Sequence, residues 1–470
     1  MNREGAFAKN TFILALGVYL PKLTTIITLP LLTGYLTKAE YGTYDLITTL
    51  VSLLLPAITL QIQSAAFRFL ISCRGSKDKV TDVVTNIFAF TIPVSIIGLT
   101  LTFFALGSSL SVLTRFMIIC YFFLDIIYIG CGQVTRGLGK NFIYASSAVV
   151  VPIANMVGIC VALLWMKNGL DGLLLSMILS CFLGIILLAY RIKIYLYISW
   201  KKISLLKIKE LLAYSWPMVP NALSNWVLSL SDRLVILKFM GIESNAIYSV
   251  ANKIPHLLKN FQGVLASAWQ ENASLSVKDL DSTDYYSKML DSINRLIVGT
   301  LACLMVFTPL LFTLLIRGDY DSAYHQMPIL YLGMYFSCMA EFLGGIYIAH
   351  MKTKSVGLTT MGAAVCNLVI NLLLINYIGI YAASISTLAA YALLFTFRLV
   401  NIYKFQPIKV SFLKLGFYLL ILLVMSVLVY MRNTVINILN AVIGITFAVF
   451  INLDIIRVII AKAINKVSKK

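Results

Sequence analysis

Long apolar runs follow one another along this chain from Thr11 to Lys462, and only short polar segments separate them. A helix needs about 20 mainly apolar residues to cross the hydrocarbon core of a bilayer. Measured against this length, the runs predict about fourteen transmembrane helices. The predicted helices cover residues 9–36, 42–73, 80–106, 110–135, 141–166, 172–198, 212–240, 244–272, 287–316, 323–350, 354–377, 379–404, 411–430 and 434–462.

The composition supports a membrane protein. Of the 470 residues, 60% are hydrophobic and only 12% are charged, whereas soluble domains have about 25% charged residues. The sequence therefore predicts an all-α polytopic membrane protein. The apolar N-terminal run lacks a signal-peptide cleavage pattern, so we expect a retained first helix. Eight single cysteines in apolar surroundings are expected to be structural thiols, with no metal and no disulfide framework.

The meaning of the net charge of +19 depends on where the basic residues lie along the chain. The N-terminus, every second loop and the C-terminal end hold 27 of the 38 lysines and arginines, and the opposite loops and helix ends hold 6. Lysine and arginine are enriched in cytoplasmic loops, so both termini and the segment KKISLLKIKE (201–210) are predicted to be cytoplasmic. Because this distribution accounts for the positive charge, we do not expect a nucleic-acid partner.

A weak internal repeat suggests two lobes. With a shift of 204 residues, GYLTKAEYGTYDL (34–46) aligns with KFMGIESNAIYSV (238–250). We expect six helices in an N-terminal lobe with a basic linker, residues 1–205, and six in a C-terminal lobe, residues 206–408. A final helix pair and basic tail occupy 409–470. Repeats of this kind are common in transporters, whose substrate sites lie between the repeats near the bilayer midplane.

Two stretches resemble a known family: NTFILALGVYLPKLTTIITLPLLTGYLTKAEYGTYDL (10–46) and YSWPMVPNALSNWVLSLSDRLVILKFMGIESNAIYSVANKI (214–254). They are similar to the polysaccharide exporter or O-antigen (Wzx-type) flippase family of the multidrug/oligosaccharidyl-lipid/polysaccharide (MATE-like) superfamily, and the resemblance covers the whole chain. It implies a flippase that moves undecaprenyl-pyrophosphate-linked oligosaccharide to the outer leaflet by alternating access. It also implies a bacterial cytoplasmic membrane, with membrane lipids and glycan polymerase or chain-length proteins as partners.

Charges within the predicted helices point to an anionic substrate. Five are basic and three are acidic, and buried net positive charge attracts anions strongly. We therefore expect these cations to line a cavity for the lipid pyrophosphate, with the acids and one histidine as coupling groups or ion-pair partners. The expected pyrophosphate ligands are Lys22, Arg68, Arg233, Lys253 and Lys259. The expected coupling or ion-pair residues are Asp125, Asp232, His256 and Glu341.

Local patterns sharpen some of these expectations. Pro255 predicts a kink in the helix 244–272. Side chains adjacent in a helix point about 100° apart, so Asp232 and Arg233 do not neutralise each other. Lys253 or Lys259 is the expected partner of Asp232, which leaves Arg233 for the cavity.

Several alternatives stay open for these charges. Arg233 could instead extend to the outer headgroups and Arg68 to the cytoplasmic ones. Lys22 could belong to a structural ion pair, and His256 could be a simple hydrogen-bonded histidine.

Polar and aromatic side chains near these charges are candidates for glycan contacts. The candidates are Tyr19, Gln61, Trp226, Tyr248 and Asn252. Tyrosine and tryptophan are also ordinary residues of the membrane interface, which is the alternative explanation for most of the 25 tyrosines.

Two other function classes were weighed. A MATE-type multidrug or cation antiporter would have an acid-rich cavity with an acid in the first helix, where this chain has Lys22. A membrane enzyme for glycan polymerisation would need a large outer loop, and the predicted loops are short. The sequence contains no catalytic triad pattern and no nucleotide-binding P-loop, so neither an enzyme nor a cofactor is expected.

Overall fold

The computed structural model describes residues 23–106, 110–454 and 457, and within these residues all regular secondary structure is helical. It divides into two compact units, Met1–Trp226 (unit 1) and Val227–Lys470 (unit 2), which are described separately. Eleven of the described helices are long and apolar enough to cross a membrane. The protein is therefore a multi-pass membrane protein.

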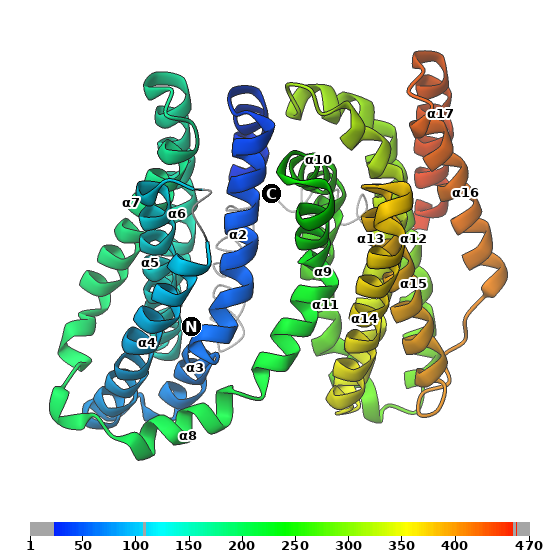
Figure 1. The fold of residues 1–470 in the computed structure, drawn as a ribbon. Helices are drawn as coiled ribbons and strands as arrows, with labels where there is room; N and C mark the ends of the chain where they lie inside the picture. Colours follow the sequence, from blue (N-terminus) through cyan, green and yellow to red (C-terminus); the bar gives the residue numbers. More distant parts are fainter. Residues whose placement is uncertain (1–22, 107–109, 455–456, 458–470) are drawn as a thin grey trace, which may run out of the picture. The chain divides into compact units, whose positions relative to one another are not determined.

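Unit 1 begins, in its described part, with a helix over Leu23–Tyr35. The following helices, coloured from blue to green in Figure 1, are α2 (Lys38–Thr59), α3 (Ile62–Cys73), α4 (Lys77–Ala105), α5 (Val112–Gly137), α6 (Asn141–Cys160), which continues as a π-helical turn (Val161–Met166), and α7 (Gly169–Ile192). Two short 3-10 turns (Ile194–Tyr197 and Trp200–Lys202) then lead to α8 (Leu205–Ser215). The unit's apolar core forms where α3, α4, α5 and α7 meet.

The Thr-Glu pair in the LTKAEYG stretch has a local structural reason. Thr37 is the N-cap of α2, and its hydroxyl accepts a hydrogen bond from the Glu40 backbone amide at 3.2 Å. The Glu40 carboxylate accepts one from the Thr37 amide at 2.9 Å in return. This capping box satisfies two backbone donors that a helix start leaves free. The capping box therefore fixes the start of α2 at Lys38.

The predicted helix 42–73 is broken in the structure. Leu60 and Gln61 both adopt left-handed backbone conformations, with φ of 49° and 58°, and they separate α2 from α3. The Leu60 carbonyl accepts a hydrogen bond at 3.0 Å from the hydroxyl of Ser215, the last residue of α8. A broken helix at membrane depth needs such a partner because the bilayer core offers no water to its free backbone groups.

Unit 2 takes in the later part of α9 (Met218–Met240), and its other helices run from green to red in Figure 1. They are α10 (Ile242–Lys253), α11 (Pro255–Leu275), α12 (Ser282–Leu315), α13 (Asp321–Ala349), α14 (Thr353–Ile378), α15 (Tyr381–Ile402), α16 (Phe412–Tyr430) and α17 (Thr434–Ile451). The helix is interrupted at the predicted place, since α10 ends at Lys253 and α11 begins at Pro255, and the kink itself stays a prediction.

Helix α13 is the centre of unit 2. In its most apolar window, 78% of the residues are buried inside the protein, the largest share among the described candidate spans. It packs against α10, α11, α12, α14, α15 and α16. A helix enclosed by protein can carry polar side chains that a lipid-facing helix cannot, because neighbouring helices supply hydrogen-bond partners. The last pair, α16 and α17, packs mainly on α12.

Each predicted helix has a counterpart among the described elements. The segment 42–73 corresponds to α2 and α3, and 244–272 corresponds to α10 and α11. Residues 9–22 of the first predicted helix lie outside the described residues. The expected division at residues 205 and 408 into two repeated lobes and a terminal pair stays a prediction.

Candidate functional site

The Asp232 carboxylate is the centre of a buried polar shell in unit 2. It is 2% exposed and accepts three hydrogen bonds. The Tyr248 hydroxyl donates at 2.9 Å and the Thr387 hydroxyl at 2.7 Å, both to Oδ2, and the Asn371 amide donates at 2.8 Å to Oδ1. The donors come from α10, α15 and α14. Three neutral donors can hold a carboxylate in an apolar interior without an ion-pair partner.

The lysine partner expected for Asp232 is thus wrong, and the helix geometry explains why. Helices α9 and α10 are joined at Gly241, whose φ is 85°. Asp232 lies nine residues before this glycine and Tyr248 seven residues after it, so the two reach a similar depth along their helices. Lys253 stands five residues beyond Tyr248, which is about 7.5 Å further along a helix. Tyrosine, rather than lysine, therefore meets the carboxylate.

Additional amide oxygens face this region without a hydrogen-bond partner. Asn367 lies one turn before Asn371 on α14, and its amide donates to the Thr387 hydroxyl at 3.4 Å. The side-chain Oδ1 atoms of both asparagines are buried and accept no hydrogen bond. The amide nitrogens of the two asparagines face Asp232 and Thr387. Within the described residues, no three His, Cys, Asp or Glu side chains gather as a metal site.

A cluster of cations forms a second polar region of unit 2. The His256 ring lies within electrostatic range of Arg233, Lys253 and Lys259, which come from α9, α10 and α11. All four side chains are half-buried. The helix break at Pro255 lies between Lys253 and His256 and separates the two halves of this segment. We call Arg233, Lys253, His256 and Lys259 the cation cluster.

Lys259 is the member of the cation cluster whose contacts are clearest. Its Nζ atom lies 3.4 Å from the Tyr391 hydroxyl and 5.7 Å from the centre of the same ring. The Glu341 carboxylate of α13 interacts with it electrostatically, without a close ion pair. A basic side chain in a partly buried site can attract an anion.

Arg398 is a buried cation that was not among the predicted site residues. It lies inside α15, 5% exposed, and is held by acceptors of the protein. The guanidinium donates to the Ala340 carbonyl at 2.7 Å and to the Thr360 hydroxyl at 3.0 Å. Tyr347 closes the arrangement by donating to the Arg398 carbonyl at 3.0 Å. These contacts give Arg398 a structural role in joining α13, α14 and α15.

The remaining predicted cations and acids lie in unit 1 or outside the described residues. Arg68 is exposed on α3, and Asp125 is half-buried on α5. Gln61 caps α3 and accepts a hydrogen bond from the Ser64 hydroxyl at 3.0 Å. Lys22 and Tyr19 lie outside the described residues. The roles predicted for these residues are untested.

Three of the five predicted glycan contacts are engaged inside the protein. Tyr248 is 3% exposed and bonds to Asp232, and the Asn252 amide donates to the Tyr248 carbonyl at 2.9 Å. In unit 1, the Trp226 indole donates to the Thr49 carbonyl at 3.2 Å and to the Ser52 hydroxyl at 3.1 Å. Buried polar side chains with internal partners are not available to a sugar, so we no longer expect glycan contacts from these three.

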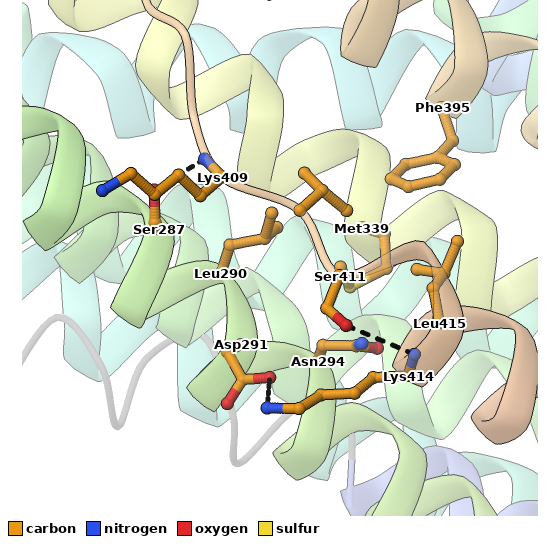
Figure 2. A pocket seen from close by; sticks show the side chains of 11 residues that line it. Ser287, Leu290, Asp291, Asn294, Met339, Phe395, Lys409, Ser411, Lys414 and Leu415 are labelled. Carbon is orange, nitrogen blue, oxygen red and sulfur yellow. Dashed lines mark hydrogen bonds and ion pairs between the residues drawn. The ribbon is translucent and has the colours of Figure 1, made fainter.

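A small cavity of about 30 Å³ lies where the α15–α16 connection crosses α12. Figure 2 shows its charged rim, in which Lys414 faces Asp291 at 3.7 Å and the Lys409 backbone donates to the Ser287 hydroxyl at 2.8 Å. A cavity of this size holds about one water molecule. These contacts fasten the last helix pair to α12 rather than forming a substrate site.

Sequence reasoning missed Asn367, Asn371, Thr387, Tyr391 and Arg398. A signal for the two asparagines was present, because their spacing of four places both amides on one face of an apolar helix. Residues at similar distances before and after Gly241 lie at a similar depth along α9 and α10. This rule would have paired Asp232 with Tyr248. The positions of Thr387 and Tyr391 on α15 could not be assigned to these sites without the packing of α13, α14 and α15.

Comparison with known proteins agrees with this architecture. The chain is similar to solved structures described as lipid II flippase MurJ in an inward closed conformation (14% identity, TM-score 0.69, covering 96% of this chain and 99% of that one) and MATE in complex with MaL6 (14%, 0.59, 85% and 96%). A further match is a MOP superfamily transporter from Pyrococcus furiosus whose structure is titled with a reverse polarity of the binding pocket (13%, 0.59, 84% and 95%). A search of curated proteins found no match.

These likenesses establish the fold, and a family profile establishes the relationship by sequence. The profile described as polysaccharide biosynthesis protein matches residues 7–270, more than half of the chain. The match includes both stretches on which the resemblance rests and reaches into α11. The chain therefore belongs to the polysaccharide biosynthesis protein family and has the fold of the MurJ and MATE transporters of the MOP superfamily.

Proposed function

We propose that this protein is a flippase for a lipid-linked oligosaccharide in surface polysaccharide biosynthesis, including O-antigen. Its substrate is an undecaprenyl-pyrophosphate-linked repeat unit, moved from the cytoplasmic to the outer leaflet of the bacterial inner membrane by alternating access. The observation that carries the proposal is the half-buried cation cluster around His256 in a chain of the polysaccharide biosynthesis family. The distribution of basic residues supports cytoplasmic termini.

The cation cluster has the chemistry that a pyrophosphate requires. Arginine offers a planar fork of donors for two phosphate oxygens, whereas lysine acts as a compact point charge. Partial burial strengthens each attraction relative to water. In this proposal Arg233 orients the pyrophosphate, while Lys253 and Lys259 supply charge, and Lys22 and Arg68 remain predicted ligands.

The shell around Asp232 is proposed as the coupling site. A carboxylate held by neutral donors can exchange a proton or a cation without breaking an ion pair. Asp125, Glu341 and His256 are the other candidates for this role. Liposomes with imposed pH, sodium and voltage gradients would distinguish the coupling ions, using the Asp232→Asn variant as the test.

The proposal is tested by transport of one defined undecaprenyl-pyrophosphate glycan in proteoliposomes. Arg233→Ala is expected to abolish translocation while the protein still inserts and purifies normally. Lys238→Ala, which removes an exposed cation from the end of the same helix, is the matched control and should transport normally. Full transport by Arg233→Ala would overturn the assignment of the cation cluster.

A MATE-type multidrug or cation antiporter is the second candidate, favoured by the similarity to MATE structures. The net positive charge of the cation cluster argues against a cationic substrate. Efflux of a cationic dye from cells that express the protein, with no glycan translocation, would establish this alternative.

A polymerase and a chain-length protein remain proposed partners of the flippase. The division into lobes 1–205 and 206–408 with a terminal pair 409–470 remains our proposed domain organisation.

A further inference from the structure

An apolar groove lies on unit 1, between α4 and the linker that joins α7 to α8. Its volume is about 360 Å³, within the range of about 300–1,000 Å³ typical of small-molecule sites. Phe88, Ala89 and Ile92 of α4 line one side, and Ile198 and Trp200 of the linker line the other. The groove has no place in the proposed transport chemistry.

Hydrogen bonds hold the linker wall in place. The Thr85 hydroxyl accepts from the Ser199 amide at 3.0 Å and donates to the Tyr197 carbonyl at 3.3 Å. The Asn86 side chain accepts from the Ser204 amide at 2.7 Å and donates to the Lys202 carbonyl at 2.9 Å. Because Thr85 is the one polar residue that lines the groove and its hydroxyl is already engaged, the groove presents an apolar surface.

The groove is lined along α4, one of the helices long and apolar enough to cross a membrane. Helix α4 begins at Lys77, and the groove extends from Thr85 to Pro93. Eight residues of helix are about 12 Å long, so the groove begins about that far from the polar start of α4 and continues for a similar length. This direction is the one that an acyl chain takes in a bilayer leaflet.

The linker combines exposed apolar side chains with unbalanced positive charge. Trp200 is 84% exposed and Ile203 is 44% exposed. Six basic residues and no acidic residue occur between positions 191 and 209. Lys202 pairs with Asp78 of α4 and Lys207 with Glu210 at 2.9 Å, whereas Lys201 is exposed and has no ion pair in the described part of the chain. Tryptophan at headgroup level and lysine beside anionic lipid are typical of membrane-surface segments.

We propose that this groove binds one anionic phospholipid of the cytoplasmic leaflet. An acyl chain occupies the space between Ala89 and Ile203, and Lys201 contacts the headgroup phosphate. The bound lipid anchors the linker and α8 to the membrane surface. Since Ser215 at the end of α8 holds the broken helix at Leu60, the lipid also supports that break. The site is separate from the proposed substrate site.

Native mass spectrometry of the purified full chain tests this, with phosphatidylglycerol and phosphatidylcholine as probes. Wild-type protein should retain one phosphatidylglycerol and no phosphatidylcholine. Lys201→Gln should weaken phosphatidylglycerol binding about fivefold, since one lysine near an anionic surface contributes about 1 kcal/mol. Lys140→Gln, an exposed lysine at the start of α6, is the matched control and should bind as wild type.

A second pair of variants tests the groove itself. Ala89→Trp fills it and should abolish retention, whereas Ala105→Trp at the exposed end of α4 should not. If Ala89→Trp does not purify as a folded protein, Ile203→Ser on the linker wall should weaken retention instead. Equal retention of the two phospholipids, or unchanged retention in the variants of the groove, would overturn the proposal. Displacement by undecaprenyl pyrophosphate would also overturn it, because the groove would then belong to the substrate.

Discussion

The Asp232 shell and the cation cluster lie on adjoining segments of unit 2, and they differ in how their charges are held. Asp232 is a single carboxylate with three short hydrogen bonds from neutral donors. In the cation cluster, three basic side chains each act electrostatically on one histidine. The carboxylate is held by neutral donors of the protein, whereas half-buried cations can attract an anionic ligand.

Removing the carboxylate should have the largest effect on stability. Asp232→Ala leaves the donors of Tyr248, Asn371 and Thr387 without their acceptor, at a cost of about 1–3 kcal/mol for each buried donor that finds no other partner. We expect a lower free energy of unfolding and a lower Tm in detergent. Asp232→Asn keeps the side-chain shape and one acceptor oxygen, so it should be less destabilising. An unchanged Tm in Asp232→Ala would show that the shell does not stabilise the fold.

The cation cluster should respond to an anionic ligand. Arg233→Gln with Lys259→Gln removes two of its charges and the Lys259–Tyr391 contact, so the test is the rise in Tm on adding the anion rather than the Tm of the free variant. Pyrophosphate should stabilise the wild type by about 2.7 kcal/mol at a hundred times its Kd and should not stabilise the double variant. The readout is the Tm with pyrophosphate and, as the anion control, with sulfate. A pyrophosphate-dependent rise in Tm that persists in the variant would place the anion elsewhere.

Some features of the fold could be predicted from the sequence, and others could not. The all-helical membrane fold followed from the length of the apolar runs, because the bilayer imposes a similar length on every span. The Pro255 break followed from the missing backbone donor of proline. The break at Leu60 and Gln61 was not predicted, since neither residue favours a left-handed conformation and the stabilising Ser215 is 155 residues away.

Site prediction succeeded for residue type more than for partners. Arg233, Lys253 and Lys259 were selected as intramembrane cations; each acts electrostatically on His256, and their role as ligands stays a prediction. The partners of Asp232 were predicted wrongly because a search for opposite charge overlooked neutral donors on α14 and α15. Tyr248 and Asn252 were assigned to glycan although they bond within unit 2. Partner choice depends on the depth and packing of helices, which composition does not contain.

Substitution of Tyr391 should have the smallest effect on stability, because Tyr391 contacts the cation cluster through Lys259 and is not itself a member. Tyr391→Phe removes the 3.4 Å contact between its hydroxyl and Lys259 Nζ but keeps the ring, whose centre lies 5.7 Å from that atom. A cation above a partly buried aromatic face is worth about 0.5–2 kcal/mol. The Phe variant should therefore lose less stability than Tyr391→Leu, which removes both contacts. If Phe and Leu reduce the Tm equally, the hydroxyl rather than the ring holds Lys259, and the lysine would be a hydrogen-bonded structural residue instead of a charge available to the pyrophosphate.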